Sequence, residues 1–124
     1  MIGRRLRVAR ALGLLAALIA PAPPAGAHAV LVKSTPASRA SLSQPPSRVE
    51  LWFNERLEPS FSSVSVWSAS SVQVDRRDSA VGPEDPKRLS VTPGPLPPGR
   101  YTVRFRVLSV DGHVVESSFP FTVR

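Results

Sequence analysis

Polar and apolar residues alternate with a period of two along much of this chain, and that period constrains its fold more than any other feature. Residues 49–53 read VELWF, residues 101–107 read YTVRFRV and residues 119–123 read FPFTV. Successive side chains of a β-strand point to opposite faces, whereas an amphipathic helix repeats its apolar residues about every 3.6 positions. No segment after residue 28 shows the helical period over a useful length. The sequence therefore predicts an all-β domain.

Clusters of proline and glycine divide the chain into short runs of this kind. The sequence after residue 27 contains 11 prolines, which suit strand ends and sheet edges rather than central strands. Several short alternating strands separated by regular turns predict a β-sandwich of immunoglobulin-like type. We expect about seven strands, near residues 30–35, 47–57, 63–69, 72–77, 88–92, 100–109 and 114–123.

The first 27 residues have the character of an export signal. The first ten contain four arginines and no acid, an apolar run follows at residues 11–20, and residues 25–27 read AGA, as at a signal-peptidase site. A membrane anchor needs about 20 apolar residues, so an anchor fits this stretch less well, as does an amphipathic helix. We expect residues 1–27 to be cleaved. One domain, residues 28–124, then remains in the periplasm, the cell envelope or the extracellular space.

Removal of this leader lowers the charge of the chain and leaves it without sulfur. Twelve of the 16 Lys and Arg residues lie after residue 27, against nine acids, which gives a net charge of +3. These basic residues are dispersed along the sequence, without the basic stripe that nucleic-acid binding favours, so we expect no nucleic-acid partner. We also expect a monomer. The chain has no cysteine, and its single methionine is Met1. Neither a thiolate nor a thioether metal site can form after cleavage.

Two histidines and one aspartate are candidate metal ligands. Cleavage after residue 27 makes His28 the first residue, so its α-amine and its imidazole can close a chelate ring on one metal ion. Asp111 and His113 are two positions apart, which points both side chains to one side of an extended segment. Taken alone, the Asp-Gly pair is typical of a hairpin turn, and His28 is simply the residue after the cut. Taken together, the chain's only two histidines favour a metal site.

The proposed set of donors favours Cu(II). His28, Asp111 and His113 would supply three nitrogens and one oxygen, and tetragonal N,O coordination suits Cu(II), which also heads the affinity order of the divalent first-row metals. The α-amine has a reference pKa of about 7.7–8.0, so a metal displaces its proton at little cost near neutral pH. We expect one Cu(II) per chain.

Several motifs in a fixed order resemble those of the copper-resistance protein C (CopC) family, exported copper-binding domains. The resemblance covers residues 28–124. The motifs that carry it are His28-Ala29, Ser34-Thr35-Pro36-Ala37, VELWFNE at 49–55, LPPGRYTV at 96–103, VLSVDGH at 107–113 and FPFTV at 119–123.

The resemblance implies a seven-stranded Greek-key β-sandwich with a Cu(II) site. It assigns the metal to His28, through amine and ring, and to Asp111 and His113. It also places Glu55 near the metal, as a weak ligand or a neighbour of the ligands, with a solvated acid at a strand end as the alternative. The Met-rich Cu(I) site of some members is expected to be absent. A membrane copper transporter of the CopD type, if it is a partner, would be a separate chain.

We therefore expect an exported Cu(II)-binding protein, not an enzyme, that sequesters copper or delivers it to a partner in copper homeostasis and resistance. One alternative is a small copper-dependent oxidative enzyme that uses an N-terminal histidine brace, for which a domain of this size has little room. The other is an immunoglobulin-like structural or adhesion module whose histidines are incidental. Copper titration separates the binding protein from the adhesion module, and an oxidation assay on polysaccharides tests for the enzyme.

Overall fold

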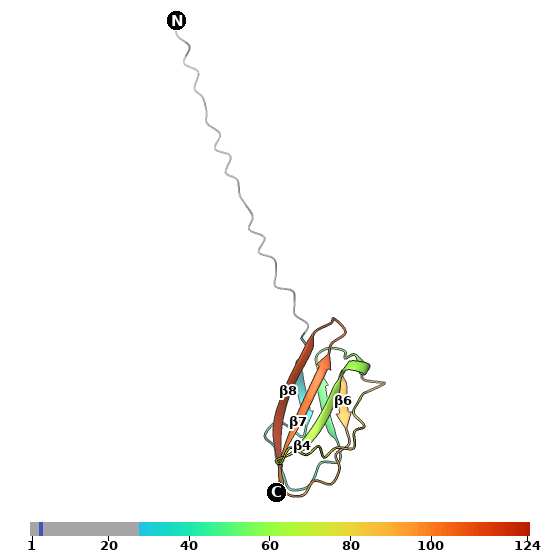
Figure 1. The fold of residues 1–124 in the computed structure, drawn as a ribbon. Helices are drawn as coiled ribbons and strands as arrows, with labels where there is room; N and C mark the ends of the chain where they lie inside the picture. Colours follow the sequence, from blue (N-terminus) through green and yellow to red (C-terminus); the bar gives the residue numbers. More distant parts are fainter. Residues whose placement is uncertain (1–2, 4–27) are drawn as a thin grey trace.

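Two four-stranded sheets pack face to face in this protein (Figure 1). The structure, a computed structural model, describes Gly3 and residues 28–124, so the predicted export signal and its cleavage site lie outside the described residues. One sheet has the strand order β1-β3-β6-β5 and the other β2-β8-β7-β4. The strands are β1 (Leu31–Thr35), β2 (Ser41–Leu42), β3 (Val49–Phe53), β4 (Ser63–Ser68), β5 (Ala80–Val81), β6 (Arg88–Val91), β7 (Gly99–Leu108) and β8 (Val114–Val123), and a 3-10 turn, η1 (Pro59–Phe61), precedes β4.

The alternation in the sequence is the burial pattern of the central strands. Val49, Leu51 and Phe53 of β3 are buried, and the residues between them are only half-buried. The long hairpin of β7 and β8 pairs antiparallel without interruption from Gly99 opposite Val123 to Leu108 opposite Val114. The architecture is the immunoglobulin-like Greek-key β-sandwich that the sequence predicts.

Aromatic side chains from both sheets meet in the core between them. The rings of Phe53 and Phe105 lie edge to face with centroids 5.4 Å apart, and those of Tyr101 and Phe121 stack at 5.5 Å. The Tyr101 hydroxyl donates a hydrogen bond to the carbonyl of Pro97, a bond back to upstream backbone like that of the tyrosine corner in immunoglobulin-like domains. Burial of the ring raises the pKa of Tyr101.

The strand predicted at residues 72–77 is wrong. This segment makes only isolated bridges and a few backbone hydrogen bonds, such as that of the Val74 amide to the Val66 carbonyl at 2.8 Å. The Asp75 carboxylate also holds it and accepts the Val66 and Arg77 amides, each at 2.8 Å. A carboxylate that replaces a backbone partner in this way cannot be read from the alternation of apolar residues. The two-residue strands β2 and β5 are too short to show any period, and the sequence did not predict them.

The end of the sandwich that matters for function is built by strand ends from both sheets. Strand β1 begins there, and β7 ends and β8 begins there, so that residue 28 and the β7–β8 loop lie at the same end of the domain (Figure 1). The C-terminus lies at the opposite end (Figure 1). Within the described part of the chain, no helix is long and apolar enough to cross a membrane.

Candidate metal centre

The two histidines, far apart in the sequence, lie against each other in the structure. Their ring centroids are 4.8 Å apart, and the ring planes meet at 62°. His28 lies just before β1 of one sheet, and His113 ends the loop that joins β7 to β8 of the other. The packing of the two sheets therefore brings these imidazoles together.

Asp111 joins this pair through His113. One carboxylate oxygen, Oδ2, lies 3.1 Å from Nδ1 of the His113 ring. A carboxylate in this position orients a metal-binding imidazole and leaves the other ring nitrogen, Nε2, available as a donor. Within residues 28–124, no three side chains of His, Asp and Glu form a ready cluster for a metal ion. The structure brings the predicted residues together as two successive contacts, His28 with His113 and His113 with Asp111.

Ser109 organises the loop that carries both of these residues. Its side chain is fully buried, and its hydroxyl donates a hydrogen bond to Oδ1 of Asp111. Its backbone amide donates to the His113 carbonyl at 3.0 Å, and its carbonyl accepts the Gly112 amide at 2.9 Å. Gly112 has a φ of 92°, a left-handed conformation that glycine adopts without the steric cost of a side chain. The VLSVDGH motif therefore forms a tight loop with its aspartate and histidine on one side.

The pKa of the Asp111 carboxyl is held below its ordinary value, first by the hydrogen bond from Ser109 and then by the contact with His113. Partial desolvation acts in the opposite direction without cancelling the effect. A carboxylate that accepts hydrogen bonds in its charged form stays ionised to lower pH. Asp111 is therefore an anion at neutral pH, as a ligand or an orienting partner of a metal-bound histidine must be.

The backbone next to His28 is held by a residue to which the sequence analysis gave no role. The Asn54 side-chain oxygen accepts the Val30 amide at 2.7 Å, and the Asn54 amide donates to the Val30 carbonyl at 3.1 Å. Between His28 and these two hydrogen bonds, Ala29 is buried in the core. Asn54 lies in the VELWFNE motif, directly after β3. A polar residue just beyond the last residue of a strand was the signal in the sequence that could have indicated this role. These contacts fix where the chain leaves the domain toward His28.

The same motif contributes Glu55, which the resemblance placed near the metal. Its side chain is half-buried, and within residues 28–124 its carboxylate takes part in no hydrogen bond or ion pair. The structure therefore connects Asp111, but not Glu55, to the two histidines by a direct contact.

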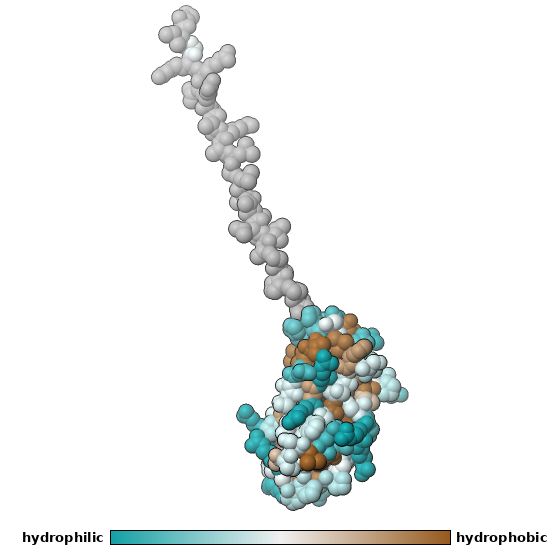
Figure 2. Space-filling model, in the orientation of Figure 1, coloured by the Kyte–Doolittle hydropathy of each residue, from teal (hydrophilic) through white to brown (hydrophobic). Residues whose placement is uncertain are grey.

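Apolar surface surrounds the histidines. His28 lines an open groove of about 430 Å³ with Val115 and Phe119, and the exposed side chains of Val30 and Val114 lie nearby in sequence. Figure 2 shows apolar atoms gathered at this end of the domain, where the grey trace joins it. Both histidines are nevertheless exposed at the edge of this apolar surface.

Fold and site together define a small immunoglobulin-like β-sandwich with a histidine pair and a partnering aspartate at one end. The CopC domain matches residues 31–124 of the chain. This protein belongs to the CopC family.

Named relatives support the same assignment. Copper resistance protein C of Pseudomonas syringae pv. tomato is 36% identical over 106 residues, 81% of this chain and 83% of that protein. Protein YobA of Escherichia coli K12 is 33% identical over 122 residues, which cover 98% of this chain and 96% of YobA.

Solved structures agree with these sequence relationships. The crystal structure of CopC from Methylosinus trichosporium OB3b superposes with a TM-score of 0.69 at 33% identity, over 77% of this chain and 93% of that one. PcoC of Escherichia coli, described as a methionine-rich copper resistance protein, gives a TM-score of 0.69 at 31% identity, over 79% and 100% of the two chains.

Proposed function

We propose that this protein is an exported Cu(II)-binding protein that sequesters copper or delivers it to a partner. Its relatives carry names of copper resistance and, in CutJ of Bacillus subtilis, of copper transport. The observation that carries the proposal is the contact of the His28 and His113 rings at 4.8 Å, with Asp111 on Nδ1 of His113. Imidazoles and a carboxylate are donors that Cu(II) accepts.

The proposal includes the cleavage of residues 1–27, which releases the His28 amine. In the uncleaved chain that nitrogen is an amide, which is a poor donor until it loses its proton. After cleavage it is a basic amine, and His28 can supply both of its nitrogens to one ion. The processed domain, residues 28–124, would then work in the periplasm, the cell envelope or outside the cell.

The residues of the site have distinct parts in this proposal. His28 chelates the ion, and His113 supplies a ring nitrogen from the loop between β7 and β8 of the opposite sheet. Asp111 binds the ion or orients the His113 ring, and the hydrogen bond from Ser109 keeps the Asp111 carboxylate in its charged form. Glu55 is assigned to the surroundings of the metal. Bound copper supplies no chemical step here because it is the cargo, and the proposal assigns no catalytic residue.

Copper titration of the exported protein tests the proposal. Electron paramagnetic resonance at substoichiometric Cu(II) should show one tetragonal species with nitrogen ligands, saturating at one ion per chain. An intact mass that lacks residues 1–27 should accompany it. Weak binding without fixed stoichiometry would instead support an adhesion module with incidental histidines. Oxygen- and reductant-dependent cleavage of a polysaccharide would support the enzyme.

If copper is delivered rather than stored, a second chain must receive it. We propose a membrane copper transporter of the CopD type as that chain, and a monomeric donor. Copper transfer between the two purified proteins, followed by the loss of the donor's Cu(II) signal, tests this part separately.

A further inference from the structure

Arginines that are dispersed in the sequence gather on one face of the folded domain. Arg100, Arg104 and Arg106 occupy outward positions of β7, where the residues between them are mostly buried. Arg39 lies beside Arg100, because its amide donates to the Pro120 carbonyl at 2.7 Å and both arginines line one hollow of about 240 Å³. The sequence shows no basic stripe, but the outer surface of the β2-β8-β7-β4 sheet therefore carries a cluster of basic side chains.

Few acids balance this charge. Glu116 is the one acid at the outward positions of β4, β7 and β8, and its Oε1 lies 2.9 Å from Nε of Arg106. Both side chains of that pair are more than half exposed, so the pair is weak. Within residues 28–124, Arg39, Arg100 and Arg104 form no ion pair with an acid. Figure 2 shows hydrophilic side chains across the middle of this face.

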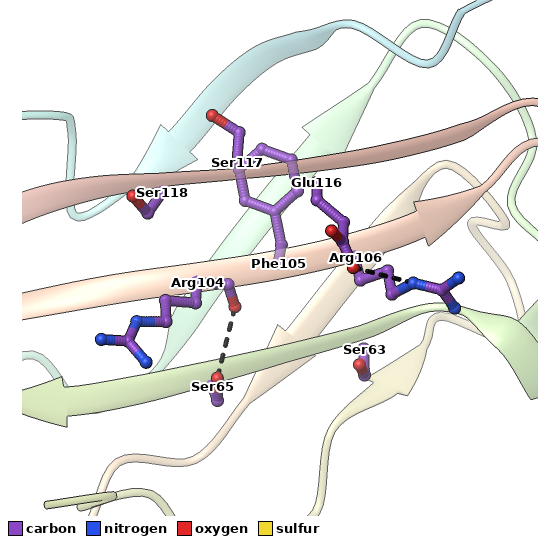
Figure 3. A pocket seen from close by; sticks show the side chains of 8 residues that line it. All are labelled: Ser63, Ser65, Arg104, Phe105, Arg106, Glu116, Ser117 and Ser118. Atoms are coloured by element: carbon purple, nitrogen blue, oxygen red, sulfur yellow. Dashed lines mark hydrogen bonds and ion pairs between the residues drawn. The ribbon is translucent and has the colours of Figure 1, made fainter. Parts of the chain in front are cut away.

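A hollow of about 400 Å³ lies on this face between β4, β7 and β8. Figure 3 shows Arg104 and Arg106 extending toward its two ends, with Ser63 and Ser65 on the neighbouring strand and Glu116 reaching Arg106. Guanidinium groups bind carboxylates in a forked geometry with two parallel hydrogen bonds. The Ser63 hydroxyl can donate to the same oxygens or to a peptide carbonyl, whereas the Ser65 hydroxyl donates to the Arg104 carbonyl at 3.5 Å (Figure 3).

An aromatic side chain beside the arginines suits this face to a protein partner. The Arg104 guanidinium lies over the Trp67 ring, 4.7 Å from its centroid. The Trp67 ring is half-buried in β4, so part of it stays accessible beside Arg104. Tryptophan and arginine dominate the binding energy of protein interfaces, and aromatic residues are enriched in them. Anionic lipid headgroups also attract basic surfaces, but the contact of Arg104 with Trp67 adds aromatic surface of the kind enriched in protein interfaces.

We propose that this arginine face, defined by Arg39, Arg100, Arg104 and Arg106, binds an extended acidic segment of a partner protein. Outward positions of a strand recur every second residue, so Arg104 and Arg106 match carboxylates at alternate positions of an extended segment. Complementary charge gives such a contact its specificity and a fast association rate.

The position of the face relates it to the candidate metal centre. Arg106 is opposite Glu116, two residue pairs before β7 ends at Leu108 opposite Val114. At about 3.4 Å per residue, that separation is about 7 Å along the strands. A partner on the arginine face therefore lies near the loop of Asp111 and His113. The proposed binding of an acidic segment depends only on the arginine face. A role of that binding in copper transfer rests on the proposed function.

The test uses the exported protein and a labelled peptide of alternating glutamate and serine, with fluorescence anisotropy as the measurement. The variant Arg104→Gln/Arg106→Gln removes two charges from the face, and Arg76→Gln/Arg77→Gln removes two exposed charges from a loop elsewhere. Exposed ion pairs contribute up to about 1 kcal/mol each, so the face variant should lose roughly three- to tenfold in affinity for the peptide. The loop variant should bind as the wild type does, and added salt should weaken both.

Cu(II) titration of the same variants separates this inference from the proposed function. Unchanged Cu(II) binding with weakened peptide binding supports the arginine face. Equal losses in the face and loop variants overturn it, because net charge alone would then explain binding. Equal binding of a glutamine–serine peptide also overturns it. Tighter binding to phosphatidylglycerol vesicles or to single-stranded DNA than to the acidic peptide overturns the assignment of a protein partner.

Discussion

His28 and His113 place their imidazole rings 4.8 Å apart at an angle of 62°, although they adjoin strands of different sheets. A metal held by both rings would tie the first strand of one sheet to the hairpin of the other. Metal binding by both rings would therefore be coupled to the stability of the sandwich.

Cu(II) should raise the thermal stability of the exported protein. A ligand that binds only the folded state stabilises it by about 2.7 kcal/mol at a concentration 100 times its dissociation constant. For a domain of this size, that corresponds to an increase in Tm of roughly 10–20 °C. Differential scanning calorimetry with and without Cu(II) measures the shift. Cu(I) under reducing conditions should give a much smaller one, since cysteine is absent from the chain and its only methionine is Met1. A larger shift with Cu(I) would reverse the proposed chemistry.

One residue added before His28 should damage copper binding more than Asp111→Asn does. The addition converts the amine to an amide and displaces the ring from its chelate, whereas the asparagine removes one charged oxygen that water can replace. His113→Ala should lie between the two, because it removes one nitrogen and leaves the chelate intact. Loss of an outer partner typically costs about 10–100-fold in affinity, and loss of the chelate should exceed that.

Competition with a chelator of known strength ranks these three variants. Wild-type affinity in the extended protein would show that the free terminus has no part in the site.

Asn54→Ala should weaken both the fold and copper binding. The variant loses the hydrogen bond from the Val30 amide to the Asn54 side chain, which costs about 0.5–1.5 kcal/mol of unfolding free energy. It also frees the segment that positions His28, so Cu(II) affinity should fall by several-fold. Urea unfolding and chelator competition measure the two effects. Gln44→Ala is the control and should change neither, because Gln44 is exposed and its side chain makes no hydrogen bond within residues 28–124. A loss of stability with unchanged affinity would remove the positioning role of Asn54.

Asp78→Asn should alter the dependence of stability on pH. The Asp78 carboxylate accepts the Thr92 hydroxyl at 2.6 Å and the Thr92 amide at 2.8 Å, and the hydroxyl bond is the main reason that the pKa of Asp78 is lowered. A carboxyl group with a lowered pKa stabilises the fold above its unfolded pKa, and this contribution is lost as the pH falls through the folded value.

Urea midpoints across the acidic range test this sign. The urea midpoint of the wild type should lie furthest above that of Asp78→Asn at pH values above about 4, the reference pKa of an aspartate. The difference between the two midpoints should shrink as the pH falls further. Glu84→Gln, an exposed acid without an ion pair in residues 28–124, should follow the wild type throughout. A difference that grows on acidification would contradict the assignment.

The class of fold was predictable because a period of two is a local property. Val49, Leu51 and Phe53 alternate in the sequence and are buried in the structure. The contact between Asp111 and His113 was predictable for the same reason, since two residues of one short loop are held together by the chain itself. Asp75 shows the limit of this kind of prediction. The apolar pattern suggested a strand there, but the Asp75 carboxylate accepts the Val66 amide in place of a backbone carbonyl of a paired strand.

What the sequence determined by itself was the composition of each strand and the chemistry available to the chain: two imidazoles, one nearby carboxylate and, after residue 27, no sulfur. The tertiary structure alone decided that His28 reaches His113, that Asn54 holds the segment beside His28, and that the dispersed arginines share one face. These relationships join residues of different strands, and their distances depend on how two sheets pack and on the register in which strands pair. A linear sequence records the spacing of residues along the chain, but the energy of packing, summed over the whole core, decides which of them meet.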